Sequence, residues 1–147
     1  MYFYNPDRFS EIDHTADIGL QAEGESLNEL FANLAFGMIR IISGEREYQP
    51  NISLHIELLE KSESDLIISW LSEINYYLNV HQFLPLIFKQ IHIQKSDNGL
   101  QLKAELSGIN ILNNSVEITT EIKAVTYHQL KFEKNNDGYV SQVIFDI

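Results

Sequence analysis

The sequence contains no cysteine, which excludes disulfide bonds and thiolate metal sites and is compatible with a reducing compartment. Basic residues are scarce as well. Ten lysines and arginines stand against 21 aspartates and glutamates, so the formal net charge is −11. A surface of this charge repels phosphates and disfavours direct, non-specific binding to nucleic acid. The composition instead favours a cation or a basic protein as partner.

Long apolar runs are also missing. No stretch approaches the ~20 residues needed to cross a bilayer, and the N-terminus lacks the basic and apolar regions of a signal peptide. We therefore expect a soluble, cytoplasmic protein without membrane contact. Only three prolines and seven glycines interrupt the chain, and its 44% of hydrophobic residues is typical of globular proteins. With 147 residues and no internal repeat, residues 1–147 are expected to form a single domain.

Two segments have the i, i+3, i+4, i+7 spacing of apolar residues that is typical of amphipathic helices. The first begins at a capping box opened by Ser26 and ends at Gly44. The second begins at Ser62 or Ser64, and its apolar face includes Trp70. Both helices are expected to bury one face.

Most other segments alternate apolar and polar residues, as strands with one buried face do. Residues Met1 to Asp7 are expected to form a loose lead-in, and Asn98–Gly99 to supply the positive φ angles of a tight hairpin turn. Strands outnumber helices, which predicts an α+β fold in which a mostly antiparallel sheet carries both amphipathic helices. The strands are expected over residues 8–13, 18–24, 51–59, 83–94, 100–107, 118–127, 129–133 and 139–147.

The chain offers few groups for catalysis. It has no Gly-x-Ser-x-Gly elbow and no glycine-rich phosphate loop, and its histidines fall singly on different segments. What remains is a set of oxygens near the two ends of the chain: Asp17 with Asp13 nearby, then Asp146 and the terminal carboxylate of Ile147. Hard cations such as Ca²⁺ and Mg²⁺ take such ligands, and a shared ion requires that the Asp17 and Asp146 carboxyl groups converge. Spacing alone equally allows both acids to be hydrogen-bonded within the fold.

Four segments resemble the archease family, in the same order along the chain. The resemblance covers the chain from end to end and implies a non-catalytic protein cofactor that activates an RtcB-type RNA ligase. Such a ligase joins 2′,3′-cyclic-phosphate or 3′-phosphate ends to 5′-hydroxyl ends in tRNA splicing and RNA repair. The four segments are Asp13-His14-Thr15-Ala16-Asp17-Ile18-Gly19, Ser26-Leu27-Asn28-Glu29-Leu30-Phe31, Ile122-Lys123-Ala124-Val125-Thr126-Tyr127-His128 and Phe145-Asp146-Ile147.

The resemblance also implies how activation works. A protein of this family promotes guanylylation of the ligase with GTP and a divalent metal, restores multiple turnover, and meets GTP and RNA only through the ligase. By position, the implied metal site is Asp17, Asp146 and Ile147, holding a divalent cation, with Ca²⁺ favoured over Mg²⁺ or Mn²⁺. Lys123 falls on the lysine of the family's Lys-Ala-x-Thr-Tyr-His motif, which implies a role in activation.

Two other classes of function stay open. The same acids could serve a metal-dependent hydrolase, and a general chaperone or interaction module without metal is the third interpretation. For Lys123, the alternative to a contact with the partner is an ion pair with Glu121 or Asp146. His14 and His128 are expected to make structural hydrogen bonds.

Overall fold

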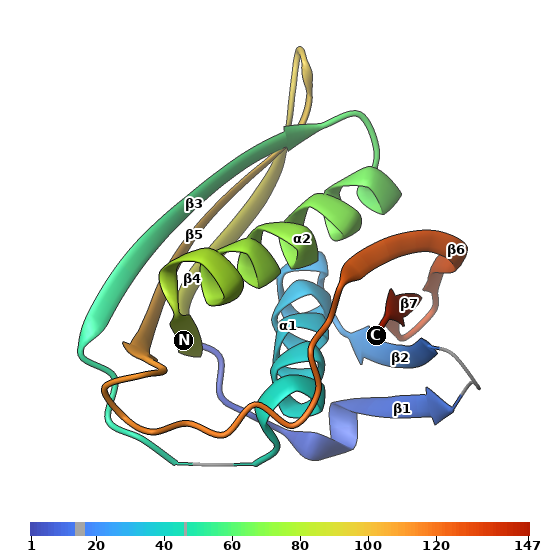
Figure 1. Ribbon diagram of the computed structural model, residues 1–147. Helices are drawn as coiled ribbons and strands as arrows, with labels where there is room; N and C mark the ends of the chain where they lie inside the picture. The colour runs from blue at the N-terminus through green and yellow to red at the C-terminus, as the bar shows by residue number, and fades with distance from the viewer. Residues whose placement is uncertain (14–16, 46) are drawn as a thin grey trace.

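Two antiparallel sheets lie on either side of a pair of helices in the computed structural model, which describes residues 1–13, 17–45 and 47–147 (Figure 1). One sheet has the strand order β1-β2-β7-β6 and the other the order β3-β5-β4. The elements are η1 (Pro6–Arg8), β1 (Phe9–Asp13), β2 (Asp17–Gly24), α1 (Leu27–Ser43), β3 (Ile52–Glu60), α2 (Glu63–His81), β4 (Phe83–Ser96), β5 (Gly99–Asn110), β6 (Ala124–Asn135) and β7 (Gly138–Asp146).

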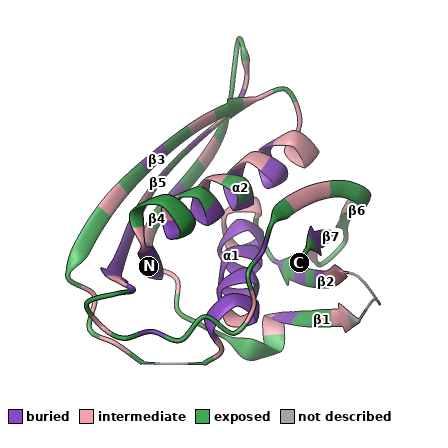
Figure 2. Cartoon of the chain, viewed as in Figure 1, coloured by how far each residue is buried: buried purple, intermediate pink, exposed green. Residues whose placement is uncertain are grey.

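Helix α1 begins and ends where its caps predict. The Ser26 hydroxyl accepts a hydrogen bond from the Glu29 N–H at 3.1 Å, and Gly44, with φ 70°, donates its N–H to the Arg40 carbonyl. Almost every residue of α1 after its first turn is buried (Figure 2). The helix contacts β1, β2 and β7 of one sheet and β4 of the other, so it forms the centre of the core.

Helix α2 starts at the predicted cap, with the Ser62 hydroxyl accepting from the Asp65 N–H at 3.1 Å. Trp70 is fully buried, and its indole N–H donates to the Phe31 carbonyl at 2.9 Å, which joins the two helices. Neither helix in the described chain is long and apolar enough to span a membrane.

The predicted α+β class and antiparallel pairing are confirmed, but the strands divide into two sheets, each built in the same way. The segments β2-α1-β6-β7 and β3-α2-β4-β5 have matching strand orders, β2-β7-β6 and β3-β5-β4. Sequence analysis found no repeat, and the structure shows why one is hard to see: the second unit is inserted between α1 and β6 of the first.

The two hairpins are also equivalent. Gly99 and Gly138 have φ of 137° and 138°, and a Cβ on either would overlap a backbone carbonyl, that of Glu60 or that of Gly24. Gly99 therefore has the expected positive φ, whereas Asn98 does not. The two-residue turn lies one position earlier than we expected, between the paired residues Ser96 and Gly99. Each hairpin packs on the chain just before a helix.

The N-terminal segment is more ordered than the loose lead-in that we expected. The Tyr2 N–H donates to the Phe88 carbonyl at 3.1 Å, which adds a bridge at β4, the edge strand of its sheet. The Asn5 side chain then caps the short helix η1, whose first residue is a proline. The segment is thus attached to the fold at Tyr2 and capped at Asn5, although most of residues 1–8 are exposed.

Candidate functional site

Asp17 and Asp146, from near the two ends of the chain, lie opposite each other in one sheet. Strand β2 pairs with β7 in an antiparallel register that places Asp17 directly opposite Asp146. Residues in such a pair have Cα atoms about 4.5–5.5 Å apart, and their side chains share one face of the sheet. The register brings the two residues together as expected, the convergence of their carboxyl groups stays a prediction, and Ile147 follows Asp146 immediately. We call Asp17, Asp146 and Ile147 the acid corner.

The buried face of this sheet fixes which side the acids occupy. Leu20 and Val143 are paired, fully buried and part of the core that α1 covers. Because side chains alternate along a strand, a slip of one residue would turn these apolar groups to water and the acids to the core. Gly19 lies between the acid corner and this core pair, and a Cβ there would press on Ile12 and Ile144 from the neighbouring strands.

Lys123 is tied to the acid corner through its backbone. Its N–H donates to the Asp146 carbonyl at 2.8 Å, just before β6 begins with Ala124 opposite Asp146. The preceding residue, Ile122, is 2% exposed, and its carbonyl accepts from the Asn75 amide at 2.9 Å. The Lys123 residue itself is exposed, and no ion pair among described residues joins it to Glu121 or Asp146. The structure therefore does not support the pairing considered as the alternative role for this lysine.

The chemistry of the acid corner suits a hard cation. Like charges directly opposite each other in a sheet are destabilising, and a divalent ion would offset the charges of Asp17, Asp146 and the C-terminal carboxylate. Within residues 1–13, 17–45 and 47–147, no group of three or more His, Cys, Asp or Glu side chains is placed to hold a metal ion. Among the described groups, the terminal carboxylate of Ile147 is the expected third acid of such a site, and metal binding stays a prediction.

Three further candidates from the sequence are not placed in the site. His14 lies outside the described residues, and of Asp13 only the backbone is described, at the end of β1 opposite Ile18. His128 is exposed, and its backbone N–H donates to the Thr126 hydroxyl at 3.3 Å. The structural hydrogen bonds expected of the two histidine side chains remain predictions.

Sequence reasoning missed two side chains of the Lys123–His128 segment that hold β6 in place. The pairing of β6 with β7 is interrupted between Thr126 and Lys131, and Gln129 within this bulge has φ 51°. The Thr126 hydroxyl donates to the Ile144 carbonyl at 2.8 Å, at the edge of the interruption. These residues keep the strand beside the acid corner despite the bulge.

Tyr127 makes the second link. Its hydroxyl donates to an Asp65 carboxylate oxygen at 2.8 Å, while the other oxygen accepts from the Ser62 hydroxyl at 3.1 Å. The hydrogen bond to Asp65 favours the neutral phenol and raises the pKa of Tyr127 above its usual value. The start of α2 is thereby connected to the bulge of β6. One sequence feature points to this role, because Tyr127 lies in the same motif as Lys123.

A statistical description of the archease protein family (MTH1598/TM1083) matches residues 9–147. The chain belongs to the archease family. Among archease proteins, that of Methanosarcina acetivorans is 34% identical over 140 residues, covering 95% of this chain and 96% of that protein. The archease of Thermococcus gammatolerans is 32% identical over 143 residues, covering 95% of this chain and 99% of the other.

Solved archease structures share the fold. The solution structure of Methanobacterium thermoautotrophicum protein 1598 has a TM-score of 0.79 and 27% identity, covering 95% of this chain and 98% of that one. The crystal structure of an archease from Thermotoga maritima, described as a possible chaperone, has a TM-score of 0.62 and 24% identity, covering 100% and 99%. The family description begins at the first residue of β1 and includes both halves of the acid corner.

Proposed function

We propose that this archease is a non-catalytic activator of an RtcB-type RNA ligase in the cytoplasm, acting in tRNA splicing or RNA repair. In this proposal it promotes guanylylation of the ligase and so restores multiple turnover. The observation that carries the proposal is the meeting of Asp17 with Asp146, because it brings the first and last of the four archease-like segments to one place. The third segment joins them there through the backbone of Lys123.

The residues of the acid corner are proposed to form a binding site for one divalent cation. Asp17 and Asp146, with the carboxylate of Ile147, would hold a divalent cation, for which Ca²⁺ is the favoured identity. When bound, the cation would supply positive charge that offsets phosphate charge during nucleotidyl transfer. The backbone of Asp146 is held from both sides, by β2 and by the Lys123 N–H, which limits where its carboxylate can reach.

Lys123 has a different part in this proposal. Its backbone is fixed at the acid corner while its side chain is exposed. An ammonium group on a flexible stem is suited to contact a phosphate or a carboxylate of the partner. Its neighbours Thr126 and Tyr127 bind to β7 and α2, which limits how far the segment can move.

The net charge of −11 supports docking on a protein and not on RNA. A ligase that binds phosphorylated RNA ends and GTP needs a basic surface, which an acidic activator complements. In this arrangement GTP and RNA meet the activator only through the ligase.

One assay separates the activator from a hydrolase and from a general chaperone. The purified protein is incubated with GTP and RNA bearing a 2′,3′-cyclic phosphate, with and without the ligase, and RNA products and GDP are counted. The proposal predicts no turnover by the protein alone and faster multiple turnover when ligase is present. Turnover without ligase would favour the hydrolase, and equal stimulation by an unrelated folding helper would favour the chaperone.

A further inference from the structure

One peptide bond beside the acid corner is held from both of its sides. The carbonyl of Ile122 accepts a hydrogen bond from the side-chain amide of Asn75 on α2 at 2.9 Å, and the N–H of Lys123 donates to the carbonyl of Asp146 on β7 at 2.8 Å. These two groups belong to the same planar peptide unit. Hydrogen bonds in such a chain polarise and strengthen one another. A continuous connection therefore runs from α2 through the peptide before Lys123 to the backbone of the acid corner.

Asn75 is an amide in a place where the fold itself favours an apolar residue. It is 9% exposed, and its neighbours one turn away on α2, Leu71 and Leu78, are 0% and 5% exposed. Its Oδ1 atom is buried and meets no donor among the residues that the structure describes. A buried acceptor without a donor destabilises a fold. The amide is therefore explained by the carbonyl that it holds and not by its packing.

Tyr127 attaches the same segment to α2 nearer the start of the helix. Its hydroxyl donates to Asp65 at 2.8 Å, and β6 lies against α2 (Figure 1). The rise from Asp65 to Asn75 along an α-helix is about 15 Å. The chain from Ile122 to Tyr127 covers about 17 Å when it is extended. The two anchors are therefore nearly as far apart as the segment is long, and the segment can shift little along α2.

Lys123 lies between these two anchors and is exposed. An ammonium group on a flexible stem has many rotamers, and each contact that it makes costs conformational entropy. A backbone that is already fixed at both ends leaves only the side chain to be ordered when the partner arrives. The contacts of α2 thus supply the order that lets Lys123 act at one place.

We propose that Asn75 and Tyr127 are positioning residues that act through Lys123. They hold its backbone beside the acid corner, so that its ammonium group meets a phosphate or a carboxylate of the partner during guanylylation of the ligase. Neither residue needs to touch the partner, so their loss should lower the guanylylation rate without weakening the complex. The inference rests on the proposed function and adds to it that α2 sets the position of the activating lysine.

The first measurement needs no ligase. Asn75→Leu removes the buried amide, and the exchange of the Lys123 amide hydrogen is followed by NMR relative to amides in the core of β5. Asn33→Leu is the matched control, because Asn33 is also a buried helix residue, 5% exposed, whose amide donates to a backbone carbonyl. That carbonyl belongs to Glu23, at the end of β2 away from Asp17. The Lys123 amide should exchange about tenfold faster in Asn75→Leu and at the parent's rate in Asn33→Leu.

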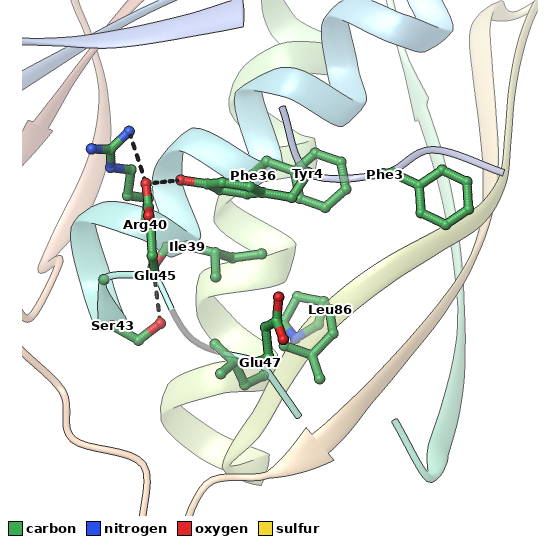
Figure 3. Close-up of a pocket in the computed structure, with 12 residues that line it drawn as sticks. Phe3, Tyr4, Phe36, Ile39, Arg40, Ser43, Glu45, Glu47 and Leu86 are labelled. Carbon is green, nitrogen blue, oxygen red and sulfur yellow. Dashed lines mark hydrogen bonds and ion pairs between the residues drawn. The ribbon is translucent and has the colours of Figure 1, made fainter. Parts of the chain in front are cut away.

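The second measurement is the single-turnover rate of ligase guanylylation as the concentration of each variant is raised. Asn75→Leu should lower the maximal rate about tenfold and Tyr127→Phe about threefold, while the concentration that gives half of the maximal rate stays within about twofold of the parent's. Asn33→Leu should keep the parent's maximal rate. So should Tyr4→Phe, the matched control for Tyr127→Phe, since Tyr4 also donates its hydroxyl to a carboxylate at 2.8 Å, that of Glu45 (Figure 3).

An unchanged Lys123 amide in Asn75→Leu would refute the positioning role while the activator function stands, and so would a maximal rate equal to the parent's in folded Asn75→Leu and Tyr127→Phe. A loss of rate that the control variants share equally would also contradict it. A higher half-saturating concentration at an unchanged maximal rate would make the two residues part of the binding surface and overturn the inference. If Asn75→Leu does not fold, Tyr127→Phe and its control decide the question. If the parent itself does not accelerate guanylylation, the proposed function fails and this inference fails with it.

Discussion

Asp146→Asn should be more stable than the parent protein without metal and less stable than the parent in excess metal. In the metal-free chain Asp146 faces Asp17 across the β2–β7 pair, and like charges at such positions are destabilising. Removing one charge should therefore stabilise the metal-free fold by roughly 0.2–1 kcal/mol, with exposure of the Asp146 side chain placing the value toward the lower end. That corresponds to an unfolding midpoint up to about 4 °C higher.

Calcium should act in the opposite direction. An ion that binds only the folded parent, at a free concentration of about 100 times its Kd, adds about 2.7 kcal/mol to the free energy of unfolding. The Asp146→Asn variant loses a carboxylate ligand, so Ca²⁺ should add much less to its free energy of unfolding. The variant should thus be the more stable protein in a chelator and the less stable one in excess Ca²⁺.

The assay is denaturant unfolding of both proteins in EDTA and in CaCl₂. Asp137→Asn is the matched control, because it makes the same substitution at an exposed aspartate in the turn before β7, at the far end of that strand. It should leave the calcium response unchanged. A variant that is destabilised in EDTA and gains as much from Ca²⁺ as the parent would refute the reasoning, since the two acids would then be structural.

Three further predictions follow from particular contacts. A short uncharged extension after Ile147 should weaken Ca²⁺ affinity in a calorimetric titration, whereas an N-terminal tag of equal length should not; equal affinities would remove the terminal carboxylate from the site. Burial and the Glu45 hydrogen bond raise the pKa of Tyr4 from 10.0 to about 12, so its contribution to stability should be full below pH 10 and lost as pH rises towards 12. Tyr4→Phe should flatten unfolding curves over that window, and an unchanged slope would contradict the assignment. Gly138→Ala should destabilise the fold by more than about 1 kcal/mol in denaturant unfolding, because its φ of 138° and its packing on Gly24 exclude a side chain; a neutral result would contradict the packing argument.

The elements that could be predicted from sequence are those that depend on local chemistry. Ser26 and Gly44 mark the ends of α1 because capping residues satisfy backbone groups within a turn of where they stand. The face that Asp17 occupies follows from the alternation of β2. Even the meeting of Asp17 with Asp146 could be proposed, because two acids that share one cation must lie close together.

What could not be predicted depends on contacts between distant segments. Alternation shows that a segment is a strand but not which strand it pairs with, so the division into two sheets and the insertion of one unit into the other stayed hidden. The Tyr127–Asp65 hydrogen bond joins residues 62 positions apart, and no local pattern indicates it. The order of the N-terminal segment depends in the same way on the remote partners of Tyr2 and Tyr4, which are Phe88 and Glu45.

The most direct test of the central claim is the single-turnover rate of ligase guanylylation, followed with labelled GTP in the presence of the parent protein or of Asp146→Asn. The account predicts that the parent raises this rate, that Asp146→Asn raises it far less, and that Asp137→Asn matches the parent. A parent protein that increases overall ligation while leaving the guanylylation rate unchanged would contradict activation at this step. A folded Asp146→Asn protein that accelerates guanylylation as well as the parent would contradict the role of the acid corner.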